Sequence, residues 1–357
     1  MKTKEKAIKE ACEAIRYGYT MKFKIICMEN NLNIDEPFFC EPYPFYNAMG
    51  TFLAYCAVCG TSEMLDWMIR DMGADPNAVG GTALRIAISE GCAEAAVKLL
   101  VLGAEPTVGT LLGAISADMP DVVSKILEVG KDFGVSDGEL LISACESASK
   151  KTIGYLIAIR KVKVTKAAYK ALFFNEKPID VIEDCLNTMH FNNGNRVVEG
   201  LEDLYMSLIE EGFITGAVAF LMDTHFKKEY DVSDFDGNNV FHYLAKCKSA
   251  FRNDDIDEAE KYITDYLFTR FYKEYPKGLI AKNVNGETPI DVAIEYGSGY
   301  LIPVFIKHIQ SYELSCTRAL ILDLCNKIEE YSNKLSRHGL IYREDDAGYW
   351  EEGHYDD

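Results

Sequence analysis

The residues best suited to chemistry in this sequence are its cysteines, histidines and carboxylates, and their spacing decides what they could do. Cys56 and Cys59 form a C-x-x-C pair, a spacing found in redox sites and in zinc sites. No second C-x-x-C pair and no paired-histidine motif completes a zinc-binding set in the sequence. We therefore interpret both cysteines as packing residues, and we predict no metal ion and no cofactor.

One acidic segment is similar in composition to a calcium-binding loop. Residues 231–237 read DVSDFDG, with the glycine at the position such a loop requires. The loop also needs an oxygen ligand where this chain has Val232, and a glutamate where it has Tyr243. Both ligands are missing, so we predict a turn at Gly237 and no calcium site.

The histidines give no catalytic pattern. Six are spread along the sequence, and we expect them not to converge: His190, His225, His242, His308, His338 and His354. The sequence also lacks a glycine-rich phosphate loop, an H-E-x-x-H motif and a G-x-S-x-G motif. These absences predict that the protein is not an enzyme.

Composition narrows the class of protein further. The chain has 357 residues, 48% of them hydrophobic, and a net charge of −19. A strongly acidic surface repels nucleic acid and anionic membranes and favours basic partners. No apolar run reaches the ~20 residues that span a bilayer, and the first residues lack the apolar stretch of a signal peptide. Eleven scattered cysteines indicate thiols in a reducing compartment, so we expect a cytoplasmic protein.

The elements that must position these residues are short helices arranged in pairs. Residues 286–297 read GETPIDVAIEYG, in which Thr288 can cap a helix and Pro289 suits its first position. Gly297 is placed to end that helix, and a second apolar helix is expected over residues 301–308. Apolar residues at helical spacing form the buried stripe: Ile290, Ala293 and Ile294.

The same pattern recurs at residues 50–76, 80–106 and 234–245. A threonine, a small residue and a glycine keep their spacing in the first two copies, as Thr51, Cys56 and Gly60 and then as Thr82, Ala87 and Gly91. A Thr-Pro helix start, a glycine break and a closing Leu-Leu-x-x-Gly-Ala at a period of about 33 residues resemble the ankyrin repeat. The resemblance is clearest at residues 50–106 and 234–308.

This resemblance implies an all-α fold, a solenoid of stacked helix-turn-helix units. We predict an N-terminal capping repeat at residues 1–34 with a polar outer face, and a divergent repeat array at residues 35–310. Residues 311–338 are expected to form a C-terminal capping helix. Residues 339–357 are an acidic tail rich in aromatic residues.

The function implied by the resemblance is protein binding through the concave face of the solenoid. The partner is expected to be another protein with a basic or mixed surface, and the sequence says nothing of the oligomeric state. Phe235 and Tyr296 are the best candidate anchors. The predicted partner-binding residues lie at turn tips, along first helices and in the tail: Val79, Glu90, Phe235, Asp236, Asn238, Asn285, Glu287, Glu295, Tyr296, Tyr349 and Trp350.

A second function remains open from the sequence. An acidic chain with an acidic aromatic tail could be a viral or bacterial effector that blocks a host or defence protein by mimicking the charge of nucleic acid. Its location would then be the host cytoplasm. An enzyme on a repeat scaffold is the weaker alternative, because the repeats leave no room for a separate catalytic domain.

Overall fold

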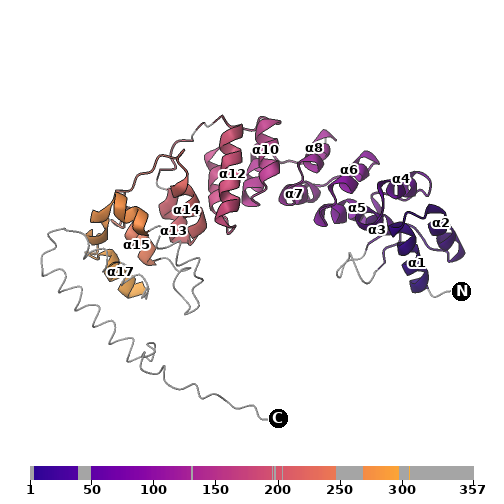
Figure 1. Ribbon diagram of the computed structural model, residues 1–357, viewed down its shortest axis with the longest axis horizontal. Helices are drawn as coiled ribbons and strands as arrows, with labels where there is room; N and C mark the ends of the chain where they lie inside the picture. Colours follow the sequence, from indigo (N-terminus) through magenta and orange to yellow (C-terminus); the bar gives the residue numbers. More distant parts are fainter. Residues whose placement is uncertain are drawn as a thin grey trace, which may run out of the picture. The chain divides into compact units, whose positions relative to one another are not determined.

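The protein is all-helical in the part of the chain that its structure describes. The computed structural model (Figure 1) describes residues 4–38, 50–129, 132–194, 196, 198–202, 204–246, 268–296 and 305. In these ranges there is no β-strand, and a single bridge joins Phe38 to Gly50. None of their helices combines the length and the apolar character needed to cross a membrane.

The helices are short, and most follow one another in pairs. Their bounds are α1 Lys4–Arg16, α2 Thr20–Glu29, α3 Phe52–Cys59, α4 Ser62–Arg70, α5 Ala78–Ser89, α6 Ala93–Val101, α7 Val108–Ser116, α8 Pro120–Glu128, α9 Asp137–Glu146, α10 Lys150–Ala158, α11 Lys166–Phe173, α12 Ile179–Asn192, α13 Leu204–Glu211, α14 Ile214–Met222, α15 Val240–Lys246, the 3-10 helix η1 Pro276–Ile280 and α17 Pro289–Tyr296.

The chain divides into two compact units, one made of residues 1–201 and 219–227 and the other of residues 202–218 and 228–357. In the first unit, the first helices of successive pairs contact one another in the order α3, α5, α7, α9 and α11. The second helices do the same in the order α4, α6, α8, α10 and α12. Each pair therefore packs on its neighbours through both of its helices.

Small buried residues allow the first helices to approach each other closely. Cys56 is 1% exposed, and the residues predicted at the same repeat position in other copies are fully buried: Ala87, Ala114, Ala144 and Ala293. The sequence interpretation of Cys56 as a packing residue is consistent with this burial. A larger side chain there would force neighbouring helices apart.

Side-chain caps explain where several first helices begin. Thr51, Thr107, Ser136 and Thr165 each accept a hydrogen bond from the backbone N–H three residues further on. Such a cap satisfies one of the N–H groups that a helix start leaves unpaired. The predicted role of Thr51 as a helix-start residue is confirmed.

The copy at α5 starts differently from the prediction. Thr82 was expected to cap its helix, but its hydroxyl donates to the carbonyl of Val79 at 2.6 Å. Val79, Gly80 and Gly81 have φ between 54° and 73°, so the chain turns left-handed before the regular helix begins. Only the two glycines adopt this conformation without strain, and Val79 is a β-branched exception.

The second unit is built on aromatic packing around α15. Phe241 in α15 packs edge-to-face against Phe268, with ring centroids 5.4 Å apart, and Phe268 packs against Phe305 at 5.0 Å. All three side chains are fully buried. The helix α17 contacts α15, and η1 contacts both.

The Thr-Pro helix start behaves as predicted. Helix α17 begins at Pro289. The N–H of Asp291 donates to the Thr288 hydroxyl at 3.4 Å, and the Asp291 carboxylate accepts from the Thr288 backbone N–H at 2.9 Å. This reciprocal pair is a capping box, with an aspartate in the place that glutamate usually occupies.

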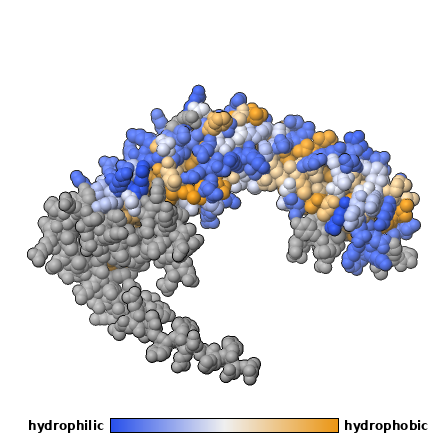
Figure 2. Space-filling view, in the orientation of Figure 1, coloured by the Kyte–Doolittle hydropathy of each residue, from blue (hydrophilic) through white to orange (hydrophobic). Residues whose placement is uncertain are grey.

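The N-terminal helix pair departs from the predicted polar outer face. The exposed side chains of α1 are all charged, but α2 exposes Met21, Ile25 and Met28 at 64%, 49% and 72%. These residues recur at helical spacing, so they form one apolar stripe. Figure 2 shows hydrophobic surface at the edge of the molecule where Figure 1 labels α2.

Several predicted segments lie outside the described residues. They are Gly297, the second helix at residues 301–308 apart from Phe305, and everything from residue 311 onwards, including the predicted capping helix and the tail with Tyr349 and Trp350.

Candidate functional site

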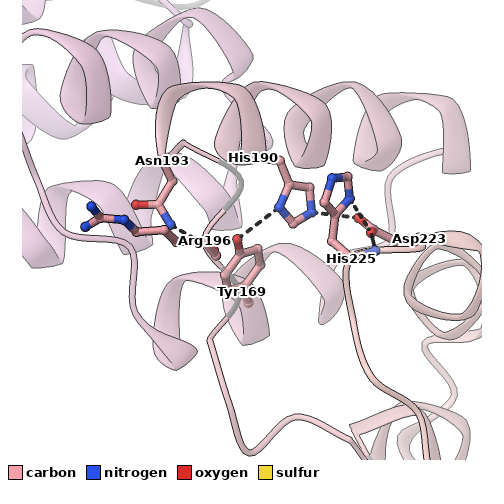
Figure 3. Close-up of polar contacts among 6 residues, drawn as sticks. All are labelled: Tyr169, His190, Asn193, Arg196, Asp223 and His225. Atoms are coloured by element: carbon pink, nitrogen blue, oxygen red, sulfur yellow. Dashed lines mark hydrogen bonds and ion pairs between the residues drawn. The ribbon is translucent and has the colours of Figure 1, made fainter.

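The expectation that the histidines do not converge is wrong for two of them. His190 and His225 stack with ring centroids 4.0 Å apart and an interplanar angle of 18°. Asp223 contacts both rings, and Figure 3 shows the three side chains pointing toward one another. One donor atom from each residue lies within 4.8 Å of the other two. We call these residues the His-Asp-His cluster.

Two helices and a tight turn position the cluster. His190 lies near the end of α12, and Asp223 directly follows α14, where its N–H donates to the carbonyl of Ala219 at 3.1 Å. The Asp223 carboxylate then accepts the backbone N–H of His225 at 2.7 Å. This turn, in which a side chain bonds to the backbone two residues on, fixes the His225 ring beside the carboxylate.

Each carboxylate oxygen of Asp223 has its own histidine. Oδ2 lies 2.7 Å from His190 Nε2, and Oδ1 lies 3.0 Å from His225 Nδ1. On the far side of the His190 ring, Nδ1 lies 3.5 Å from the hydroxyl of Tyr169 in α11. A neutral His190 that donates from Nε2 to Asp223 can accept the Tyr169 proton at Nδ1, so all its polar atoms are satisfied.

The cluster is buried at one end and open at the other. The side chains of His190, Asp223 and His225 are 2%, 8% and 36% exposed. Burial raises the pKa of Asp223, but hydrogen bonds from His190 and His225 outweigh it and hold that pKa below its ordinary value. Asp223 is therefore a carboxylate at neutral pH, held among apolar and aromatic neighbours.

An open cavity of about 280 Å³ lies against the exposed side of the cluster. Asp223 and His225 line it, together with Glu183 and Asn187 of α12 and Thr224. A small polar ligand or water can therefore reach the carboxylate and His225 from solvent. Nothing in the wall is a lysine or arginine, so the cavity favours cations over anions.

Sequence reasoning missed this cluster, although one signal pointed to it. His190 and Asp223 are 33 residues apart, which is the period of the predicted repeat. In a repeat array of this period, two residues 33 positions apart would occupy equivalent positions in adjacent repeats. A search for histidines and carboxylates 33 residues apart would have paired His190 with Asp223.

Five of the predicted interaction residues of the second unit lie on two loops joined by hydrogen bonds. In the loop 234–238, Phe235 is completely exposed and Asp236 is exposed. In the loop 283–287, Asn285 is exposed and Glu287 is half-buried. The N–H of Val284 donates to the Asp236 carbonyl at 2.8 Å, so the two loop tips lie side by side.

Asn238 does not lie on the surface, contrary to the prediction. It is 3% exposed, its side chain donates to the Asp234 carboxylate at 2.9 Å, and its carbonyl oxygen accepts from Asn283 at 3.1 Å. The Asp234 carboxylate also accepts the hydroxyl of Tyr243 at 2.8 Å. These bonds engage the Asp234 carboxylate, which belongs to the segment similar to a calcium loop, and they make Asn238 a structural residue.

The remaining predicted residues are scattered. Val79 is 47% exposed in the left-handed turn, Glu90 is exposed at the end of α5, and Glu295 is exposed on α17. Val79 and Glu90 belong to the first compact unit, and Glu295 belongs to the second. The side chain of Tyr296 lies outside the described residues, as do Tyr349 and Trp350.

The two cysteines of the C-x-x-C pair differ in burial. Cys56 is buried and Cys59 is half-buried. Burial raises the pKa of the Cys56 thiol to about 12, with a smaller contribution from Cys59. A thiol is a nucleophile and a strong metal ligand only as the thiolate, so Cys56 is inert at neutral pH.

A scan against protein-family models found no match for this chain, and no curated protein matches it.

Proposed function

We propose that the protein is an ankyrin-type repeat solenoid that binds a partner protein and has no catalytic activity of its own. Two features support the repeat assignment. First helices contact first helices and second helices contact second helices along α3 to α12. Small residues occupy the equivalent buried position in Cys56, Ala87 and Ala293. Stacked repeats of this kind present their turn tips as a continuous binding surface.

The observation that carries the binding function is the exposure of Phe235 on a rigid loop. Phe235 is 105% exposed, and the neighbouring tip residue Val284 is 67% exposed. The loops beneath them are held by bonds from Asn283 to Asn238 and from Val284 to Asp236. Such preorganised apolar tips lose little conformational entropy on binding, and aromatic residues are enriched among the side chains that dominate binding energy.

The test compares binding by single-residue variants of the full chain. Partners are captured from the native cytoplasm and identified, and their affinities are then measured with purified proteins. We expect Phe235→Ala to weaken the principal partner by about 2 kcal/mol, roughly 30-fold, because the ring would fill a pocket on the partner. Circular dichroism and the unfolding midpoint should not change, because the Phe235 ring is completely exposed and is not part of the core.

Phe191→Ala is the matched control, because Phe191 is also a phenylalanine that is 82% exposed but lies on α12. It should leave the affinity unchanged. Equal affinities for the wild type and the Phe235→Ala variant would refute a binding surface at these loops. A chain ending at Arg337 tests the tail separately, since partners that survive the deletion do not need Tyr349 or Trp350.

The net charge of −19 favours a second candidate function, an acidic effector or inhibitor that blocks a host or defence protein by mimicking nucleic acid. Both functions place the protein in the cytoplasm, which would be the host's in the second case. Salt separates them. An affinity that falls steeply between 50 and 300 mM salt, roughly 100-fold or more, supports charge mimicry, whereas apolar contacts through Phe235 are nearly insensitive to salt.

A further inference from the structure

We propose that the His-Asp-His cluster is a binding site for a divalent first-row metal ion, with Zn²⁺ as the reference ion. The ligands would be His190 Nε2, a carboxylate oxygen of Asp223 and His225 Nδ1. This site does not depend on the proposed protein-binding function, because none of its residues lies on the loops that carry Phe235.

The donor set suits such an ion. Two imidazole nitrogens and one carboxylate oxygen are ligands that zinc accepts in proteins, and open zinc sites commonly have three protein ligands. Hard cations such as Mg²⁺ and Ca²⁺ prefer oxygen ligands, so two histidines select against them. The carboxylate of Asp223 supplies a negative charge inside a largely buried group, which a cation would compensate.

The geometry requires a modest widening of two contacts and a reorientation of one ring. The nitrogen atoms of His190 and His225 lie 2.7 and 3.0 Å from the Asp223 oxygens, which are hydrogen-bond distances. Zinc ligands at 2.0–2.1 Å in tetrahedral geometry place neighbouring donor atoms about 3.3 Å apart. Each contact therefore has to widen by a few tenths of an ångström. The two rings also stack at an interplanar angle of 18°, so the partly exposed His225 ring has to rotate out of the stack for both nitrogens to point at one ion.

The surroundings of His190 provide a further feature of a metal site, a partner for the ring nitrogen that would not bind the ion. A His190 bound through Nε2 would carry its proton on Nδ1, and the Tyr169 hydroxyl at 3.5 Å can accept it. A hydrogen bond of this kind fixes the tautomer and the ring orientation of a metal ligand. The cavity beside Asp223 and His225 leaves the fourth coordination position open to water or to a donor from a bound molecule.

Nearby thiols do not compete for the ion. Cys145 and Cys185 are both buried in the same unit. Burial raises the pKa of Cys185 to about 12 and that of Cys145 further. Both remain protonated at neutral pH, so they are poor ligands.

The experiment measures cobalt and zinc binding to the full-length protein under reducing conditions, after metal has been stripped with a chelator. Co²⁺ is used because its spectrum distinguishes nitrogen and oxygen ligands from thiolates. We expect one Co²⁺ per chain with no thiolate charge-transfer band, displaced by Zn²⁺. His225→Gln and Asp223→Asn should each weaken the affinity by more than 100-fold, and Tyr169→Phe by about 10-fold, as loss of an outer partner typically does.

Asp184→Asn is the matched control, because Asp184 is an exposed carboxylate of α12 paired with Lys150 and not with the cluster. It should bind cobalt like the wild type. The His225 side chain is one-third exposed, so His225→Gln should fold even if Asp223→Asn does not. Unchanged affinity in His225→Gln, a thiolate band, or no binding by the wild type would overturn the proposal and leave the cluster as a hydrogen-bonded clamp.

Discussion

His242 connects two loops of the second unit through a neutral imidazole ring. Its Nδ1 accepts the backbone N–H of Asn239 at 3.1 Å, and its Nε2 donates to the carbonyl of Glu287 at 3.1 Å. The side chain is fully buried. Nδ1 also lies 3.0 Å from the Asn239 side-chain oxygen, which could accept a proton from it, so burial is the main reason why the ring is suited to its neutral form.

This arrangement predicts a loss of stability in mild acid. Burial lowers the pKa of His242 below its ordinary value, and the bond to the Glu287 carbonyl only partly opposes that effect. The unfolded chain therefore binds the proton more readily than the folded one. The contribution of the neutral His242 ring to the free energy of unfolding should be fully present above about pH 6.5. It should fall as the pH drops below that value, by at most about 1.4 kcal/mol per pH unit.

Urea unfolding at several pH values between 5 and 8 measures this dependence, with the second unit followed by hydrogen exchange. His242→Gln removes the titrating group and should flatten the pH dependence in this range, although the variant will be less stable throughout. A variant that keeps the full slope would show that another group is responsible.

At the scale of the element, the turn into α5 stores strain at one residue. Val79 has φ near 54°, a conformation that crowds a β-branched side chain, and its carbonyl is tied to the Thr82 hydroxyl. The side chain is about half exposed, so packing does not explain its presence. Strain of this kind persists where the surrounding structure or a function maintains it.

We expect Val79→Asn to stabilise the protein by about 1 kcal/mol, because asparagine tolerates the left-handed region. The measurement is the free energy of unfolding in urea. Val101→Asn is the matched control, since Val101 is similarly exposed but lies within α6. It should be neutral or slightly destabilising, and equal effects of the two substitutions would contradict the strain argument.

The sequence predicted a helix well where neighbouring residues in the sequence are enough to determine its start and its buried face. Thr288, Pro289 and the buried Ile290 and Ala293 specify a helix start and its inner face with no help from the rest of the fold. The start of α5 could not be predicted in this way, because Gly80 and Gly81 permit a left-handed entry that Thr82 alone does not reveal. Burial of Asn238 was also hidden, because its partner Asn283 lies 45 residues away.

At the scale of the whole chain, the error over the histidines has a physical cause. Residues that are many repeats apart in a stack are distant in space, and for this reason none of the six histidines was expected to meet another. Residues about one period apart are neighbours, so His190, Asp223 and His225 meet although 35 residues separate the two histidines. Sequence distance in a stacked fold has to be compared with the period rather than with the chain length.

We expect the two compact units to respond separately, the first to zinc and the second to protonation of His242. Zinc at 100 times its dissociation constant should add about 2.7 kcal/mol to the stability of the unit that contains His190. Hydrogen exchange with mass spectrometry should then show new protection in peptides covering residues 169–190 and 219–227. Peptides covering residues 234–246, which include His242, should not change, and equal protection in both would contradict independent units.

The apolar stripe of α2 determines how the protein would age under oxidants. Met21 and Met28 offer their sulfur atoms to solvent, whereas Met64, Met68 and Met189 are at most 1% exposed. Peroxide converts accessible methionine to a polar sulfoxide, and enzymes can reverse that change. Met222 is also 47% exposed, so among the described methionines the first lesions would fall on this stripe and on Met222. The stripe would become polar, whereas the buried methionines would remain unoxidised.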